Sequence, residues 1–175
     1  MAAPNNRFLG KFRGRVVDNN DPLRIGRLTV SVPDVLGDEA STWALPCLPF
    51  TGPQSGQFVV PAVGAGVWVE FEQGDPSFPV WTGAWYGSAD ELPLDAQKEL
   101  QAGATKPVVI QTPGKHKIVM SDTPGGGIHL EAATGAWLDI DEKGVTIGNG
   151  AGAVITLIGN QVNINEGRLI VPKKR

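Results

Sequence analysis

Side chains that could support chemistry are few in this sequence, and they lie far apart. Asp139 and Asp141 precede Gly144 as at the start of a calcium-binding loop, but the later oxygen ligands of such a loop are absent. His116 and His129 stand alone, without the closely spaced partners of a metal-binding motif. No serine lies in a nucleophile motif. The sequence therefore predicts no catalytic residue, no metal site and no cofactor.

Two further features have ordinary structural interpretations. Glu70 and Glu72 are expected on one face of a strand, where their spacing resembles that of a carboxylate pair, but no signature of a cleft surrounds them. Cys47 is the single cysteine, so there is no disulfide framework, and we expect it to be a small buried apolar side chain. We therefore expect a protein that is not an enzyme.

Composition points to an all-β chain. The 175 residues include 23 glycines and 14 prolines, which favours strands joined by many turns over helices. No apolar run approaches the roughly twenty residues of a membrane helix, and residues 1–6 lack the apolar core of a signal peptide. The net charge of -3 argues against a general nucleic-acid binder. Basic residues nevertheless gather near the N-terminus, where they could meet an acidic partner: Arg7, Lys11, Arg13, Arg15, Arg24 and Arg27.

From residue 107 to 171 the chain repeats a short strand followed by a glycine-rich turn. Apolar residues alternate with polar ones at a period of two, which places them on one face of each strand. The inward residues predicted from this pattern are Ile118, Met120, Ile128, Leu130, Leu138, Ile140, Val145, Ile147, Val162 and Ile164. In residues 153–160 the pattern leaves two alternatives open, because Val154 and Ile158 compete with Ile155 and Leu157 for that face.

Such a narrow apolar stripe needs a cover that one copy of the repeat cannot supply. Three chains winding around a common axis would bury it, with each strand finding partners from another chain and with polar side chains outward. Half of an ordinary single-chain β-sandwich would show the same alternation. The repeat alone does not decide between these two architectures.

The first 88 residues read as five strands that close into a small barrel. The expected strands cover residues 8–17, 23–32, 43–48, 66–73 and 78–86, which is typical of an OB-type barrel. The barrel turn at Gly74, Asp75 and Pro76 should stop strand pairing, since glycine can take a positive φ, aspartate can bond the backbone and proline lacks an N–H. Residues 89–106 form a linker with one short helix or only coil, and residues 172–175 form a basic tail.

Two stretches carry a resemblance to a known family. NDPLRIGRLTV at residues 20–30 holds a DPxxxGR pattern, and VGAGVWVEFEQGDPSFPVWTG at residues 63–83 holds FxxGDPxxPVxxG, about forty residues later. Together they resemble the OB-fold of the central spike proteins of contractile tails, which include phage baseplate spikes and the valine-glycine-repeat proteins of type VI secretion. In that family an OB barrel precedes an intertwined trimeric β-helix. The resemblance covers nearly the whole chain.

The resemblance implies a structural role. It implies a homotrimeric spike, assembled in the bacterial cytoplasm, that plugs the tube end of a baseplate and pierces the target membrane when the sheath contracts. No hub domain precedes the barrel, which implies a separate trimeric hub protein. The end of the last strand, at Leu169, Ile170 and Val171, implies contact with a small tip protein of the PAAR type. Phage tails, tailocins and injection systems all fit this description.

Two other functions remain open from the residues. OB barrels often bind oligosaccharide or single-stranded nucleic acid, and Trp68, Trp81 or Trp85 could stack on such a ligand. Some spikes carry a cell-wall hydrolase between barrel and fibre, but only about twenty residues lie there in this chain. The residues therefore favour a spike over a binding module, and a binding module over an enzyme.

Overall fold

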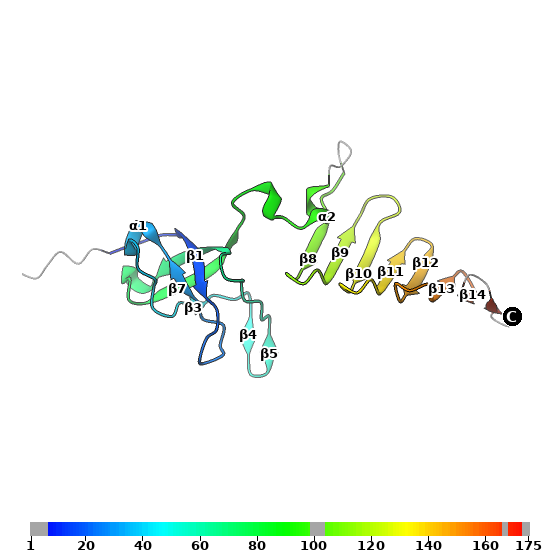
Figure 1. The fold of residues 1–175 in the computed structure, drawn as a ribbon, viewed down its shortest axis with the longest axis horizontal. Helices are drawn as coiled ribbons and strands as arrows, with labels where there is room; N and C mark the ends of the chain where they lie inside the picture. Colours follow the sequence, from blue (N-terminus) through cyan, green and yellow to red (C-terminus); the bar gives the residue numbers. More distant parts are fainter. Residues whose placement is uncertain (1–6, 99–103, 166–167, 173–175) are drawn as a thin grey trace, which may run out of the picture. The chain divides into compact units, whose positions relative to one another are not determined.

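The computed structural model describes residues 7–98, 104–165 and 168–172, and Figure 1 shows the all-β chain that they form. The chain divides into two compact units, Met1–Ser88 and Ala89–Arg175. No helix among the described residues has the length and apolar character that crossing a membrane requires. The predicted all-β class is confirmed, and each unit is built on a sheet of its own.

The N-terminal unit is a five-stranded sheet that curls into a barrel. Its strands are β1 (Phe12–Asp18), β2 (Thr29–Ser31), β3 (Leu45–Pro46), β6 (Gly66–Phe71) and β7 (Pro79–Trp85), in the order β2-β1-β6-β7-β3. β3 runs parallel to β7, whereas the other pairs are antiparallel. The two ends of the sheet meet where Leu28 and Ala44 exchange backbone hydrogen bonds of 3.1 and 2.7 Å. This bridge closes the predicted OB-type barrel.

The barrel interior is filled by aliphatic and aromatic side chains from all five strand regions. Val67 and Val69 of β6 are fully buried and Phe71 is nearly so, as alternation along that strand predicts. The complete core is Val16, Leu28, Val30, Val32, Ala44, Val67, Val69, Phe71 and Trp81. Burial of this set is the main driving force for folding of the unit.

One carboxylate organises the loop before β2. Asp21, with its side chain 3% exposed, accepts hydrogen bonds from the backbone N–H groups of Leu23, Ile25 and Arg27 at 3.0, 2.9 and 3.2 Å. The Arg27 guanidinium donates to Asp21 Oδ1 at 2.6 and 2.9 Å and lies over the Trp43 ring. The hydrogen bonds from the Arg27 side chain, helped by those from the backbone, outweigh burial and hold the pKa of Asp21 well below its usual range.

This loop corrects the predicted strand over residues 23–32. The Asp21 carboxylate takes the N–H groups of residues 23, 25 and 27, so strand β2 begins only at Thr29. After β2 the chain makes one helical turn, α1 (Pro33–Leu36), with proline at its start. Between β3 and β6 a small hairpin pairs β4 (Thr51–Gly52) with β5 (Ser55–Gly56).

The turn after β6 is a single 3₁₀ turn (Glu72–Gly74), in which Gly74 has a φ of 79°. Asp75 Oδ1 accepts the Ser77 N–H at 2.9 Å, so the aspartate bonds the backbone two residues on. Because Glu72 lies in this turn and not in β6, the expectation that it shares a strand face with Glu70 is wrong. Cys47 is exposed rather than buried, which corrects that expectation also.

The C-terminal unit begins with a short 3₁₀ turn (Ala89–Glu91) and the helix α2 (Leu94–Gln97). Of the two alternatives predicted for the linker at residues 89–106, the structure forms the one with a short helix, while residues 99–103 lie outside the described residues. Eight strands follow in chain order, each antiparallel to the next, as Figure 1 shows. They are β8 (Val108–Gln111), β9 (Lys117–Ser121), β10 (Gly127–Glu131), β11 (Trp137–Asp141), β12 (Gly144–Gly148), β13 (Val154–Ile158), β14 (Gln161–Ile164) and β15 (Leu169–Pro172).

Pairing in this sheet is entirely between neighbours in the same chain. The expectation that each strand would find its partners in another chain is therefore wrong for these ladders. The backbone groups between strands are satisfied, but a single sheet leaves its two faces without a second layer. The face of this sheet that carries the apolar side chains therefore needs a cover from outside the unit.

Candidate functional site

The strand register lines up apolar side chains in two continuous rows on one face of the C-terminal sheet. The first row runs Ile110, Ile118, Leu130, Leu138, Ile147, Ile155, Ile164 and Leu169, and the second runs Val108, Met120, Ile128, Ile140, Val145, Leu157 and Val162. We call these fifteen residues the apolar face. Directly opposed aliphatic residues on neighbouring strands pack against each other along each row.

The apolar face is open to solvent in the single chain. Ile110 is 59% exposed, Ile147 is 45% exposed and Leu157 is 43% exposed, values far from those of a core. Scattered exposed apolar residues are ordinary, whereas a contiguous row across eight strands marks an interaction surface. The geometry therefore shows a sheet whose inner strands, β9 to β14, are paired on both sides within the chain and whose apolar face is uncovered.

All ten residues that the sequence analysis placed inward lie on this face. The pairing also decides the alternative left open in residues 153–160, because Ile155 is opposite Ile147 and Leu157 is opposite Val145. Val154 and Ile158 consequently point to the other side, with Thr156 between them. The structure adds Val108 and Ile110 of β8, which are not among the ten predicted inward residues.

The expected tip contact lies in the last strand, β15, which pairs with β14 and forms one edge of the sheet. Leu169 is 54% exposed. The backbone of Ile170 pairs with Asn163 and that of Val171 with Val162. Of the predicted basic tail, only Pro172 is described, as the last residue of β15.

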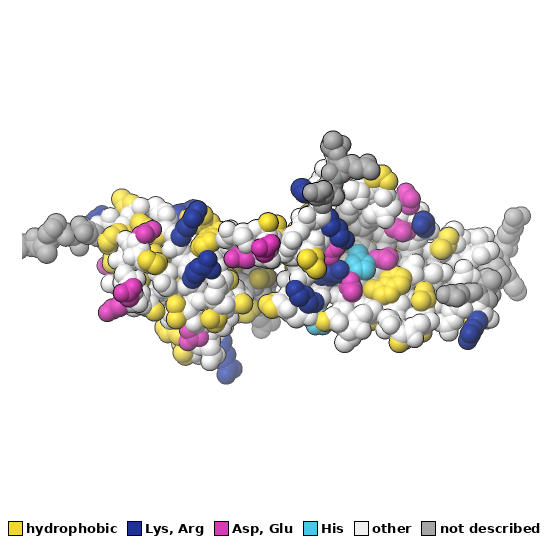
Figure 2. Space-filling view, turned by 45° about the horizontal axis from the view of Figure 1, so that its top comes forward, with side chains coloured by type: hydrophobic (Ala, Val, Ile, Leu, Met, Phe, Trp, Pro, Cys, Tyr) yellow, Lys and Arg dark blue, Asp and Glu magenta, His cyan; other side chains and the backbone are white. Residues whose placement is uncertain are grey.

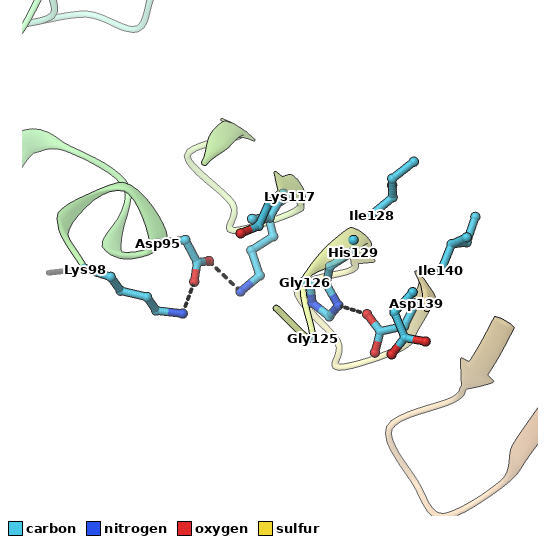
Figure 3. Close-up of a pocket in the computed structure, with 13 residues that line it drawn as sticks. Asp95, Lys98, Lys117, Gly125, Gly126, Ile128, His129, Asp139 and Ile140 are labelled. Atoms are coloured by element: carbon cyan, nitrogen blue, oxygen red, sulfur yellow. Dashed lines mark hydrogen bonds and ion pairs between the residues drawn. The ribbon is translucent and has the colours of Figure 1, made fainter. Parts of the chain in front are cut away.

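The opposite face of the sheet carries a chain of charged side chains. His129 Nδ1 lies 2.5 Å from Asp139 Oδ1, and His129 Nε2 lies 3.0 Å from Glu131 Oε2. Glu131 also meets Lys117 Nζ at 3.0 Å. Lys117 in turn reaches Asp95 of α2 at 2.9 Å, a contact drawn in Figure 3. This charged cluster, which gathers acidic and basic side chains around an imidazole in Figure 2, ties α2 to the sheet.

A hollow of about 320 Å³ adjoins this cluster. Its walls include Lys117, His129 and Asp139, together with the glycine turn at residues 125–127. All the charged groups in the cluster are already paired with one another. Within residues 7–98, 104–165 and 168–172 there is no group of three or more His, Cys, Asp or Glu side chains that could hold a metal ion.

Both ring nitrogens of His129 face carboxylates, which accept hydrogen bonds and do not donate when ionised. The imidazolium, with two N–H donors, therefore fits this position better than the neutral ring. Burial lowers the pKa of His129, but the hydrogen bonds to Glu131 and Asp139 outweigh it and the net shift is upward. The hydrogen bonds that Glu131 accepts from His129 and Lys117 lower the pKa of that carboxyl.

We expect His129 to make the stability of the C-terminal unit depend on pH. Because its pKa is raised on folding, its contribution is complete below about pH 6.5 and is lost as pH rises through the folded pKa. The side chain is one-third exposed, so the loss should stay below about 1 kcal/mol. Thermal melts of the wild type and His129→Gln across this range test this, and equal pH dependence in both would contradict it.

The other candidate ligands have ordinary roles. Asp141 Oδ1 accepts the backbone N–H groups of Lys143 and Gly144 at 2.8 and 3.2 Å, so it stabilises a turn. His116 is exposed, and its Nδ1 accepts the Ala133 N–H at 3.3 Å. Sequence reasoning missed both the Asp21–Arg27 pair and the contacts of Asp95 with Lys117. The DPxxxGR pattern was a usable signal for the first, whereas no local pattern indicates the second.

Comparison with known families assigns both units. Residues 12–86 match the model of the type VI secretion system/phage-baseplate injector OB domain. Residues 107–170 match the model of the phage baseplate V C-terminal trimerisation domain. A search of curated proteins found no match. The two matched ranges coincide with the barrel and with the sheet that bears the apolar face.

Proposed function

Because the chain belongs to the phage baseplate V spike proteins, with an injector OB domain followed by a trimerisation domain, we propose that it is the central spike of a contractile tail or injection-system baseplate. Three copies would bring their apolar faces together around one axis. The charged face of each sheet would then lie outward. The predicted trimer core of Ile118, Met120, Ile128, Leu130, Leu138, Ile140, Val145, Ile147, Val162 and Ile164 would fill the centre.

The observation that carries this proposal is the uncovered apolar face. Aliphatic rows across eight strands, open in one chain, require a cover of the same chemistry and length. Three identical sheets supply such a cover under three-fold symmetry. A domain family described by its trimerisation supports that stoichiometry.

The proposed action is mechanical. Sheath contraction would drive the spike through the target envelope, and the antiparallel hydrogen-bond ladders would spread the axial load over many bonds. A separate trimeric hub would hold the barrel end, and a PAAR-type tip protein would sit on β15 at Leu169, Ile170 and Val171. The protein would assemble in the bacterial cytoplasm, would bind no nucleic acid, and would contact the target membrane only transiently. The families are structural baseplate components, and we propose no catalytic activity for this chain.

A deletion in the genome that encodes the chain tests this function. We expect particles from the deletion strain to lack the central density at the baseplate and to lose infection or killing. Complementation with the wild-type gene should restore both, and antibodies against the chain should label the baseplate end. Fully active particles without the protein would contradict the proposal.

A further inference from the structure

Two arginines and two tryptophans form a surface on the outside of the barrel. Arg13 and Arg15 alternate along β1, so both point out of the barrel. Arg13 is opposite Trp68 of β6, and Arg15 is opposite Gly66, which is itself opposite Trp85 of β7. We call the four side chains Arg13, Arg15, Trp68 and Trp85 the arginine-tryptophan face.

The guanidinium groups lie over the indole rings. Arg13 Cζ is 5.8 Å from the Trp68 ring centroid and 5.4 Å from that of Trp85, and Arg15 Cζ is 5.1 Å from that of Trp85. The two indole rings are themselves 6.5 Å apart. Cation-π attraction therefore holds both guanidinium groups over an aromatic base.

The position of Trp85 is fixed by the barrel. Trp81 of the same strand points into the core, and a register shift in the β6–β7 pair turns Trp85 to the outside. Its Nε1 donates to the Val67 carbonyl at 3.1 Å. A Cβ atom on Gly66 would come within 2.6 Å of the Trp85 ring, so the indole lies directly on the glycine backbone. The face is thus preorganised before any partner arrives.

The two arginines lack acidic partners. Among the residues that the structure describes, neither has a carboxylate within 4.0 Å, and Arg15 donates only to the Gly64 carbonyl at 3.1 Å. Lys11, just before β1, is by contrast paired with Glu70 at 3.2 Å. A concavity of about 280 Å³, lined by Arg13, Gly14, Arg15, Ser31, Pro33 and Trp85, adjoins them. The face therefore offers two guanidinium groups without an acidic partner among the described residues, next to a concavity lined in part by the Trp85 ring.

We propose that the arginine-tryptophan face binds an acidic segment of the hub protein. This rests on the proposed function, which requires a separate hub. Each guanidinium can bind a carboxylate in a bidentate pair. The two indole rings can pack against apolar side chains that lie between two acidic residues of the hub segment. The face lies in the barrel, whereas the surface that fits further copies of this chain lies in the C-terminal unit.

Nucleic acid fits the face less well. Two unpaired cations do not form the extended basic groove that follows a single-stranded backbone over several nucleotides. The chain's net charge of -3 also repels a polyanion. A protein segment with a few carboxylates needs only the local match that the two arginines provide.

Photocross-linking in assembled particles identifies the molecule that binds the arginine-tryptophan face. Pro33 is exposed at the rim of the hollow and can be replaced by a benzoylphenylalanine probe in the otherwise wild-type chain. We expect a cross-link to a hub segment that contains aspartate or glutamate. A cross-link to a second copy of this chain, a cross-link to nucleic acid, or none in particles that contain the spike would overturn the proposal. Particles that contain no spike would instead contradict the proposed function.

The affinity between purified spike and purified hub provides a second test of this proposal. The double variant Arg13→Gln with Arg15→Gln should weaken binding at least about tenfold, because it removes both charged contacts. Arg24→Gln, which removes an exposed arginine of the same barrel outside this face, should bind as the wild type does. The oligomeric mass and barrel melting of each variant are measured in parallel. Unchanged affinity in the folded double variant would overturn the assignment.

Discussion

Replacing Leu138 and Ile140 together with aspartate is expected to convert the spike into monomers while the barrel stays folded. Both residues lie near the middle of the apolar face, one in each row. In the trimer each chain would place two carboxylates in an apolar centre with no cation to pair them. Each buried, unpaired charge costs several kcal/mol, so association should weaken by at least about a thousandfold. Sedimentation equilibrium of the purified variant measures this.

The matched control places the same charges on the other face. Thr156 and Gln161 lie on β13 and β14 and point away from the apolar face by register. The double variant Thr156→Asp with Gln161→Asp should remain trimeric. A trimer that survives aspartates at 138 and 140, or that is lost equally with those at 156 and 161, would show that the inward assignment is wrong.

Removing the Asp21 carboxylate should give the largest loss of barrel stability from a single substitution. Asp21→Ala leaves three backbone N–H groups without their acceptor and leaves the Arg27 guanidinium, 17% exposed, without its partner. Buried donors that lose their acceptor are costly, since no water replaces it fully. We expect the barrel transition to fall by about 10 °C in calorimetry, with the C-terminal unit unaffected.

The milder variant Asp21→Asn separates charge from hydrogen bonding. The folded pKa of Asp21 lies below its unfolded value of about 3.9, so its ionic contribution is complete above that pH and declines as the solution becomes more acidic. The wild-type barrel should therefore lose stability below about pH 4, and the asparagine variant should lack that part of the decline. Identical acid profiles would contradict the role given to the Asp21–Arg27 pair.

The alternation of side chains was enough to predict much of the fold. In the C-terminal unit, strands of four or five residues with glycine-rich turns produced a clear period of two, and the structure forms those strands. The barrel and its inward residues Val67, Val69 and Phe71 followed from the same period. Strand alternation is a local property, so it can be read without knowledge of the partners.

The register of β13, the start of β2 and the charged cluster could not be predicted from the alternation of side chains. Residues 154–158 read Val, Ile, Thr, Leu, Ile, so both faces carry two apolar residues, and only the pairing of Thr156 with Thr146 decides the register. β2 begins late because the Asp21 carboxylate accepts hydrogen bonds from three backbone N–H groups of the preceding loop. The charged cluster joins Asp95 to Lys117 across a stretch of chain with no periodic signal. Contacts of this kind are set by tertiary structure and not by a local pattern.

The oligomeric state of the wild-type chain tests the central claim most directly. Sedimentation equilibrium at micromolar concentration should give three times the chain mass of 18.5 kDa, with no loss of trimer on dilution through that range. Such a result would support cover of the apolar face by two further copies, at the location that the aspartate variants at 138 and 140 test. A mass of 18.5 kDa under the same conditions would contradict the account, because a monomer would leave that face in water.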